Sequence, residues 1–280
     1  MQKNAIATLA PAKVNLSLHV TGQRKDGFHL LDSLVTFVDV GDRLAISRHD
    51  VGLTLEIDGN FANDVSVHDN LVLKAGRMIM PADGGATFRL TKNIPVASGL
   101  GGGSGDAAAA LRLGAEYWKR PLPGLQDQLK LGADVPVCLK GESVRMQGIG
   151  EKLTPIPQMP QLHMVLLNPG IPLATAEVFA ALEKRNNPPM DTPPKKPGDL
   201  AKWLNHQRND LQTTAVSLRP SIGDCLSALV HQGAILARMS GSGASCFGLF
   251  ESAHLAEHAA LAIEKSAPGW WVEACNSIRH

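Results

Sequence analysis

The chain has no excess of charge of one sign. Lys and Arg number 27 against 26 for Asp and Glu, so the formal net charge is +1 at pH 7. Such a balance creates no global electrostatic field toward nucleic acid or an anionic membrane. We therefore expect neither as a partner, and any highly charged ligand must be bound by a local site.

Paired cysteines and long apolar runs are also missing. No pair of cysteines has the close spacing of a zinc site, and the wide separation argues against a disulfide scaffold as well. No stretch approaches the roughly 18 apolar residues of a membrane-spanning helix. The apolar residues 5–12 (AIATLAPA) are interrupted by Thr8 and Pro11, which makes them a poor signal peptide. A soluble, cytoplasmic protein with small buried thiols is expected. The cysteines are Cys138, Cys225, Cys246 and Cys275.

What is present is enough apolar sequence for one large domain or two ordinary ones. The chain has 280 residues, of which 44% are hydrophobic and 19% charged. Strand-like and helix-like patterns come in separate runs, which is typical of the α+β class. The proline-bearing stretch TPIPQMP (154–160) indicates a boundary, giving domains 1–155 and 156–280.

Periodicity predicts the individual elements. Residues 14–20 alternate apolar and polar, which predicts a half-buried strand with Lys13 and Asn15 on its polar face. Further strands are expected at 34–40, 43–48 and 53–57 as an antiparallel meander, and at 86–91, 135–139, 142–147, 162–167, 246–250 and 271–276. Helices are expected from 69 or 70 onward and at 105–118, 125–131, 175–184, 199–204, 210–218, 222–232 and 254–266, with a proline-rich loop at 186–198.

The most unusual stretch is PVASGLGGGSG, residues 95–105. It places five glycines in the seven positions 99–105, between an expected strand and an expected helix that Ser104 could cap. Converging backbone N–H groups and a helix N-terminus form an anion site, and phosphate is its natural ligand. The remaining alternative is a tight turn with close packing.

Two better-known phosphate motifs do not fit this loop. A Walker A motif requires a Lys after its last glycine, where this chain has Asp106. The spacing of Gly103, Gly105 and Ala108 satisfies the dinucleotide pattern, but that fold needs a strand with an acidic residue about 20 positions later. The sequence there, RPLPGLQDQ, predicts a turn and a helix.

Four other residues could take part in chemistry, although each has an ordinary structural alternative. Asp134, in GADVP, is either a turn or cap residue or a functional acid or base. Lys13 could be a solvated side chain, Phe28 a core aromatic and His29 a surface histidine.

Taken together, the motifs resemble those of the GHMP kinases over nearly the whole chain. The resemblance implies a two-domain α+β GHMP kinase fold, with a ribosomal S5 domain 2-like N-terminal domain and a ferredoxin-like C-terminal domain. The glycine loop alone indicates only the superfamily. GQRKDGFH and GADVP are particular to members that phosphorylate a cytidine diphosphate-linked methylerythritol on the non-mevalonate route to isoprenoid precursors. The matching segments are PAKVNLSLHVTGQRKDGFHLLDSL, DNLVLKA, IPVASGLGGGSGDAAAAL, LGADVPVCLKG, GIGEKLTPI, RNDLQ and MSGSGAS.

The same resemblance implies the cofactors ATP and Mg²⁺ and a role for each site residue. Asp134 would orient the acceptor hydroxyl and take its proton, with Lys13 beside it. Phe28 and His29 would recognise cytosine, Phe179 would stack on the other side of the base, and Asn15 would help to hold the substrate. The ATP phosphates would be bound by Pro95, Val96, Ala97, Ser98, Gly99, Leu100, Gly101, Gly102, Gly103, Ser104 and Gly105, with Ser104 next to the metal.

Three positions depart from the family pattern. Gly105 and Asp106 stand where serine and asparagine are usual, and the charge of Asp106 could either repel nucleotide or assist the metal. Phe28 stands where a tyrosine is usual, which keeps the stacking face and loses a hydroxyl. The alternatives to this function are another GHMP kinase, of the homoserine or mevalonate type, and a non-catalytic sensor on the same fold. We expect a monomer or a weak homodimer.

Overall fold

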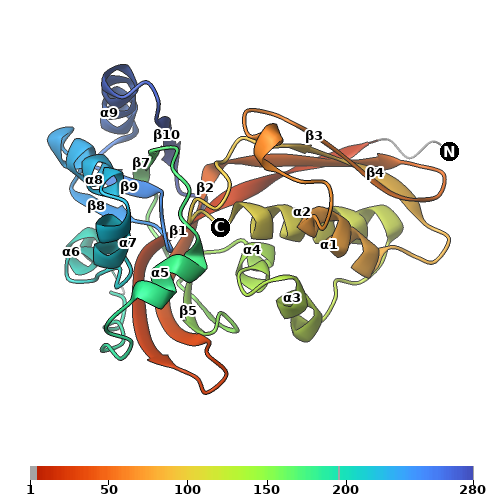
Figure 1. The fold of residues 1–280 in the computed structure, drawn as a ribbon, viewed down its shortest axis with the longest axis horizontal. Coiled ribbons are helices and arrows are strands. Elements are labelled where there is room, and N and C mark those ends of the chain that lie inside the picture. The colour runs from red at the N-terminus through yellow and green to blue at the C-terminus, as the bar shows by residue number, and fades with distance from the viewer. Residues whose placement is uncertain (1–4, 195, 280) are drawn as a thin grey trace. The chain divides into compact units, whose positions relative to one another are not determined.

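The computed structural model describes residues 5–194 and 196–279 (Figure 1). They form two compact units, each built from separate segments of the chain. Unit 1 contains the chain up to Ala12, Gly41–Val96 and Gly101–Gly141, and unit 2 contains Lys13–Val40, Ala97–Leu100 and the chain from Glu142 onward. The predicted division at 155/156 follows the chain rather than these units, and it stays a prediction.

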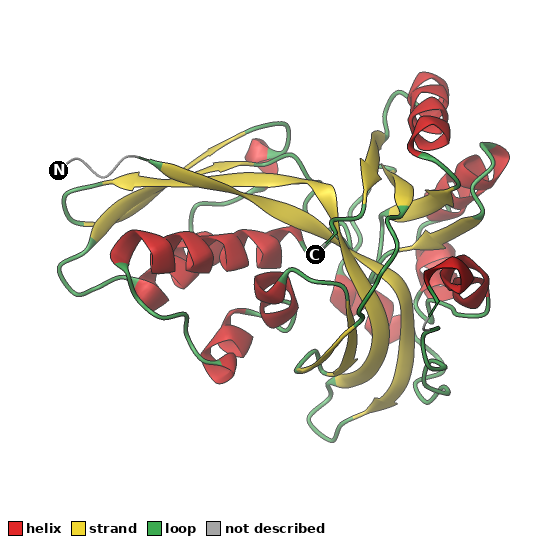
Figure 2. Ribbon diagram, turned by 180° about the vertical axis from the view of Figure 1, so that it is seen from behind, coloured by secondary structure: helices red, strands yellow, loops and turns green. Residues whose placement is uncertain are grey.

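Unit 1 is a sheet with helices on one face (Figure 2). The second part of β2 (His29–Arg48) pairs antiparallel with β4 (Gly85–Thr91), and β4 pairs in parallel with β3 (Gly52–Asp58). Phe88, Leu44 and Leu111 lie in the apolar core between the sheet and the helices. The unit also holds the first part of β1 (Ile6–Gln23), η1 (Ala62–Asp64), α1 (Leu71–Ile79), α2 (Gly102–Trp118), α3 (Leu125–Leu131) and α4 (Val135–Lys140).

Unit 2 combines a strand layer with a four-stranded sheet. The first part of β2 pairs antiparallel with β5 (Val144–Gly148), which pairs with β6 (Lys152–Pro155). The four-stranded sheet is antiparallel in the order β10-β7-β9-β8. Its apolar core includes Val165, Leu229 and Ile263. The elements are β7 (His163–Asn168), α5 (Thr175–Ala181), η2 (Pro197–Asp199), α6 (Leu200–Asn205), α7 (Gln212–Leu218), α8 (Ser221–His231), β8 (Leu236–Met239), β9 (Cys246–Phe250), α9 (Ala253–Ser266) and β10 (Trp271–Asn276).

Most of the predicted elements are confirmed. Helix α1 begins after Asn70, whose side chain accepts a hydrogen bond from the Val72 N–H at 2.9 Å, as expected of an N-cap. After α2 the chain continues into helices, so the dinucleotide fold is excluded as predicted. Residues 186–194 and 196 lie outside helices and strands, while Lys195, within the predicted loop, lies outside the described residues. All four cysteines are buried and free.

Four predictions about local structure were wrong. The expected strands 34–40 and 43–48 are one continuous strand, β2. Strand β3 pairs with β4 and not with β2, and it does so in parallel, as a helical crossover between β3 and β4 allows, so there is no meander. Residues 135–139 belong to helix α4, because a short apolar run fits a strand and a buried helix equally well. Helix α2 starts at Gly102, so Ser104 lies inside it and caps nothing.

The polar face of β1 is buried rather than solvated. Lys13 is 4% exposed and Asn15 is 1% exposed, although the alternation predicted a half-buried strand. In the part of the chain that the structure describes, no helix combines the length and the apolarity needed to cross a bilayer.

Candidate active site

The central part of the glycine loop, Ala97–Leu100, is held by a second glycine turn, residues 239–245. The N–H of Ser245 donates to the Ser98 carbonyl at 2.9 Å, and the Ser240 hydroxyl donates to the Gly99 carbonyl at 3.0 Å. Gly99 has a φ of +78°, and a Cβ there would lie 2.3 Å from the Ser240 carbonyl oxygen. Glycine at 99 is therefore required by the packing of the protein itself.

The end of the loop forms the first turn of α2, where the backbone remains open. Gly103 is exposed, and a Cβ at this position would meet only the Leu71 side chain, at an ordinary 3.6 Å. Packing does not require glycine there, whereas close approach of a ligand to the N–H groups at the positive end of this helix does. In the described chain the buried Ser98 hydroxyl has no hydrogen-bond partner. An open helix N-terminus of this kind is suited to a phosphate group.

A buried ion cluster lies next to the first turn of α2. The Lys92 ammonium donates to Asp42 and, at 2.9 Å, to Asp106 Oδ2, and all three side chains are at most 6% exposed. A Cβ on Gly102 would lie 2.9 Å from Lys92 Nζ, so the ammonium is close to the loop backbone. Burial alone would lower the pKa of Lys92, but the two carboxylates outweigh it and raise that pKa.

The contacts of Asp106 within this ion cluster determine the effect of its charge. One of its oxygens pairs with Lys92, which it shares with Asp42, so the ammonium offsets part of the negative charge of the two carboxylates. Burial, opposed by Lys92 and assisted by Asp42, raises the pKa of Asp106 to about 7. Sequence reasoning missed Lys92 and Asp42, because nothing in the local pattern marks them as partners of a residue in a later helix.

Asp134 lies beside the same helix end. It directly precedes α4, is half-buried, and does not use its side chain to cap that helix. Two residues earlier, a Cβ on Gly132 would lie 3.7 Å from the Ser104 hydroxyl. Unit 1 therefore brings the GADVP segment next to the end of the glycine loop.

Lys13 and Asn15 form a hydrogen-bonded series in unit 2. The Lys13 ammonium donates to Asn15 Oδ1 at 3.0 Å, and Asn15 Nδ2 donates to the Ser33 hydroxyl at 2.7 Å. The Lys13 N–H also donates to the Leu100 carbonyl at 2.9 Å, which ties β1 to the loop. The lysine head is thus held in a defined place despite its long side chain.

The predicted base-recognition residues also lie in unit 2. The rings of His29 and Phe179 stack with centroids 4.5 Å apart and an angle of 24°. Phe28 is 57% exposed, so its face is open to a ligand. Burial, and then the Arg185 guanidinium, lower the pKa of His29. In the described chain its Nε2 is buried without a partner, so the site holds a neutral imidazole with an unused hydrogen-bonding atom.

Known proteins identify the family. The family model described as "GHMP kinases N terminal domain" matches residues 70–142, and the model described as "GHMP kinases C terminal" matches residues 180–269. A protein of Cereibacter sphaeroides, called 4-diphosphocytidyl-2-C-methyl-D-erythritol kinase, is 53% identical over 277 residues, which are 96% of this chain and 98% of that protein. The chain belongs to the GHMP kinase family.

Solved GHMP kinases share the fold. A crystal structure described as 4-(cytidine 5'-diphospho)-2C-methyl-D-erythritol kinase has a TM-score of 0.82 and 30% identity, covering 98% of this chain and all of that one. A homoserine kinase from Cytophaga hutchinsonii has a TM-score of 0.71 at 18% identity, covering 99% of this chain and 95% of that one. The expected two-sheet α+β fold of the GHMP kinases is confirmed.

In this GHMP kinase the predicted site residues form three groups. Pro95, Val96, Gly101–Gly105 and Asp134 lie in unit 1, where the segment that holds Asp134 approaches the loop end through Gly132. Ala97–Leu100 lies with Lys13 and Asn15 in unit 2, where Phe28, His29 and Phe179 make the third group. The pairing of Lys13 with Asp134 would join the two units and stays a prediction.

Proposed function

We propose that this chain transfers the γ-phosphoryl group of ATP to the 2-hydroxyl of 4-diphosphocytidyl-2-C-methyl-D-erythritol, on the non-mevalonate route to isoprenoid precursors. The observation that carries the proposal is the 53% identity, over nearly the full length of both chains, to a protein named for that kinase activity. The homoserine kinase, at 18% identity, supports the fold alone.

ATP would be bound mainly by backbone. Phosphoryl transfer has a loose transition state, so the protein chiefly positions the reactants and neutralises charge. The N–H groups of residues 95–105 and the N-terminus of α2 would bind the phosphates, with Lys13 adding a positive charge.

Mg²⁺ would enter with the nucleotide. In the described residues no group of three His, Cys, Asp or Glu side chains could hold a metal ion by itself. Mg²⁺ commonly keeps several waters and is held by substrate phosphates with few protein ligands. The Ser104 hydroxyl, in the first turn of α2, would supply one of them.

Asp134 would act on the acceptor hydroxyl. A carboxylate at the loop end can accept a hydrogen bond from the hydroxyl, align its oxygen for attack and take its proton. Asn15 and Lys13 would hold the same part of the substrate. At the other end of the substrate, Phe28 and Phe179 would contact the base and His29 would hydrogen-bond to it.

The remaining expectations belong to the same proposal. The enzyme would work in the cytoplasm, as a monomer or weak homodimer, on a small molecule and without nucleic acid or membrane. Four buried free thiols are compatible with a reducing compartment.

The test is an ADP-release assay coupled to a dehydrogenase. It compares 4-diphosphocytidyl-2-C-methyl-D-erythritol with homoserine and mevalonate, each with and without Mg²⁺. We expect Mg²⁺-dependent release with the cytidine-linked alcohol alone. Preference for homoserine or mevalonate would assign another GHMP kinase activity, and the absence of turnover with all three would support the sensor.

Phe28 provides a prediction about specificity. Replacing it by Ala removes a stacking face worth about 1–3 kcal/mol per base, so the KM for the cytidine-linked substrate should rise about 10- to 100-fold. The KM for ATP should not change. Phe28→Tyr, which restores the residue usual in the family, is the matched control and should keep a low KM. Equal kinetics for the Ala variant would remove Phe28 from the base site.

A further inference from the structure

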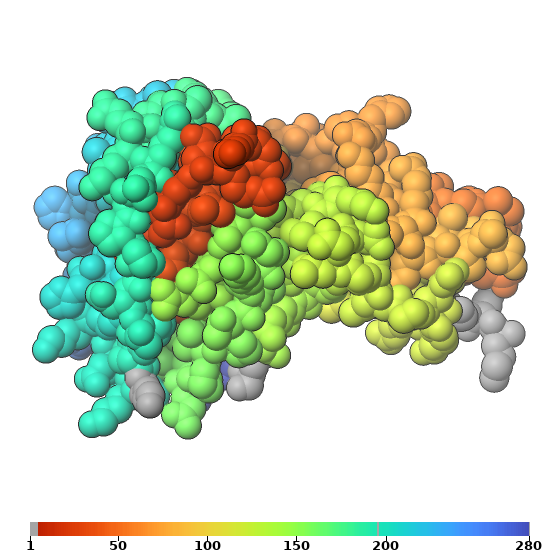
Figure 3. Space-filling model, turned by 90° about the horizontal axis from the view of Figure 1, so that it is seen from below, coloured from red at the N-terminus to blue at the C-terminus, as the bar shows by residue number. Residues whose placement is uncertain are grey.

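A short segment of unit 2, Asn186–Met190, is bound to strands β1 and β2 by polar contacts. We call it the strap. Figure 3 shows this part of the chain, in teal, directly beside the red surface of the β1–β2 hairpin. The strap has no regular secondary structure, so these contacts and the burial of the Met190 side chain fix its backbone.

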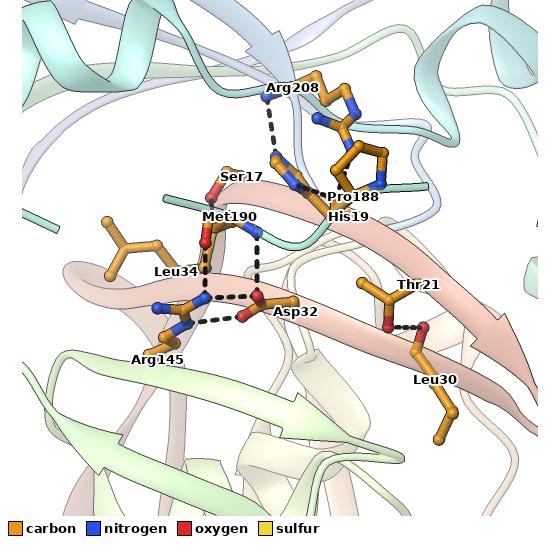
Figure 4. A network of polar contacts seen from close by, with 10 residues as sticks. All are labelled: Ser17, His19, Thr21, Leu30, Asp32, Leu34, Arg145, Pro188, Met190 and Arg208. Carbon is orange, nitrogen blue, oxygen red and sulfur yellow. Dashed lines mark hydrogen bonds and ion pairs between the residues drawn. The ribbon is translucent and has the colours of Figure 1, made fainter. Parts of the chain in front are cut away.

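One end of the strap is held by an ion pair (Figure 4). Arg145 on β5 and Asp32 on β2 form a two-point pair, with Nε to Oδ1 at 2.8 Å and Nη2 to Oδ2 at 2.6 Å. The Met190 N–H donates to Asp32 Oδ2 at 3.0 Å, and its carbonyl accepts from Arg145 Nη2 at 2.8 Å. Both polar groups of one backbone unit are thus held by a single charge pair.

The middle of the strap is held by β1. The backbone N–H and the side-chain amide of Asn187 both donate to the Val20 carbonyl, at 3.0 and 3.1 Å. The Pro188 carbonyl accepts from Arg208 Nη2 at 2.7 Å and lies 3.2 Å from His19 Nδ1. Burial, and then Arg208, lower the pKa of His19, so its ring is neutral and Nδ1–H can donate to Pro188.

The strap also connects to the base-recognition group. Seven residues before Asn186 is Phe179, which stacks on His29. Arg185, directly before the strap, is close enough to His29 to contribute to lowering its pKa. On the other side, Asn186–Pro189 line a cavity of about 690 Å³ together with Leu30, Leu31 and Asp32. A displacement of the strap would therefore shift both Phe179, which stacks on His29, and the wall of the cavity that includes Leu30.

The presence of the Asp32–Arg145 ion pair is not explained by its contribution to the stability of the fold. Asp32 is 1% exposed, and removing a carboxylate from water costs about as much free energy as a well-formed pair returns. An apolar pair of similar size could stabilise the fold equally well, but it could not hold both the N–H and the carbonyl of Met190. What the charged pair adds is a defined backbone position.

We propose that Asp32 and Arg145 are positioning residues for nucleobase recognition: by clasping Met190 they fix the strap, and through it the placement of Phe179 against His29. The inference rests on the proposed function and deepens it. Neither residue needs to touch the base. If the Asp32–Arg145 pair no longer holds Met190, the arrangement of Phe179 and His29 that binds the base is populated for only part of the time. The apparent dissociation constant for the nucleotide then rises in inverse proportion to that population.

The experiment measures binding of cytidine 5'-diphosphate by calorimetry to the wild-type protein and to the double variant Asp32→Asn/Arg145→Met. Removing both charges avoids leaving one buried ion without its partner. We expect the dissociation constant to rise about tenfold, and the KM for the cytidine-linked alcohol to rise in parallel. Both kcat and the KM for ATP should stay within about twofold of wild type. Hydrogen exchange should show faster exchange of the Met190 amide.

Two further variants separate positioning from general destabilisation. Arg145→Lys keeps the charge but loses the two-point geometry, and should give an intermediate dissociation constant. Glu56→Gln/Arg89→Met removes an exposed ion pair of unit 1, and should leave binding unchanged.

The outcomes are distinguishable. Unchanged binding in the double variant, together with faster exchange at Met190, would overturn the inference. So would a parallel loss of kcat and of affinity for both substrates, which indicates a merely structural pair, or a wild-type protein that does not bind cytidine 5'-diphosphate. If the wild type binds this nucleotide but releases no ADP with the cytidine-linked alcohol, the proposed reaction fails while the inference is still decided by the binding constants.

Discussion

Replacing Asp134 by Asn is expected to lower kcat by about 10²- to 10⁴-fold, which is the usual contribution of a positioned general base. Asparagine keeps the size of the side chain and can still accept a hydrogen bond, but it cannot take the proton of the hydroxyl. Since the proposed phosphate site consists of backbone N–H groups, the dissociation constant for ATP should change by less than about twofold. The measurement is coupled ADP release for kcat, with calorimetry for nucleotide binding.

The matched control for this variant is Asp127→Asn. Asp127 is an exposed carboxylate in the first turn of the neighbouring helix α3, paired with Lys130 at 2.7 Å. It should keep full turnover. An Asp134→Asn enzyme with the same kcat as the control would exclude Asp134 from the chemistry, whereas parallel losses of kcat and of ATP affinity would indicate a displaced loop.

The second large effect is on stability. Lys92→Met should lower the free energy of unfolding by about 3–5 kcal/mol, because it leaves the Asp42 and Asp106 carboxylates buried without their shared cation. Asp42 also accepts the N–H groups of Asn93 and Ile94, at 2.6 and 2.9 Å, so the chain leading into the glycine loop depends on its position. Urea denaturation at pH 7 measures the change.

Two further proteins test the cause of this loss. Arg89→Met breaks an ion pair that is more than half exposed, and should cost at most about 1 kcal/mol. Adding Asp106→Asn to Lys92→Met removes one of the two carboxylates, and should restore part of the lost stability. A loss in Lys92→Met no larger than that in Arg89→Met would show that the buried cluster does not stabilise the fold.

The departure at position 106 shows how much a tertiary contact can change the interpretation of a residue. In the sequence, an aspartate at the start of a phosphate-binding helix is ambiguous, because its charge could oppose nucleotide or attract metal. In the structure its Oδ2 is bound to Lys92, fourteen residues earlier in the chain, and Asp42 is a further fifty residues away from that lysine. The sequence contains all three residues but no signal of their contact.

Secondary structure could be predicted where one face of an element is clearly apolar or where a cap is present, as in α1. It could not be predicted at residues 135–139, where the run is too short and too uniformly apolar to distinguish helix from strand. The solvated face predicted for β1 was wrong for a related reason. Period-two alternation shows that two faces differ, but not that the polar one reaches water.

By itself the sequence determined the α+β class and the family, because these depend on local conformation and on motif order along the chain. Only the tertiary structure decided that Lys13 and Asn15 are buried, that Asp106 is paired with Lys92, and that Phe179 stacks on His29. The physical reason is that burial and pairing depend on which distant segments meet. A local sequence pattern does not show which distant segment will pack against it and bury it.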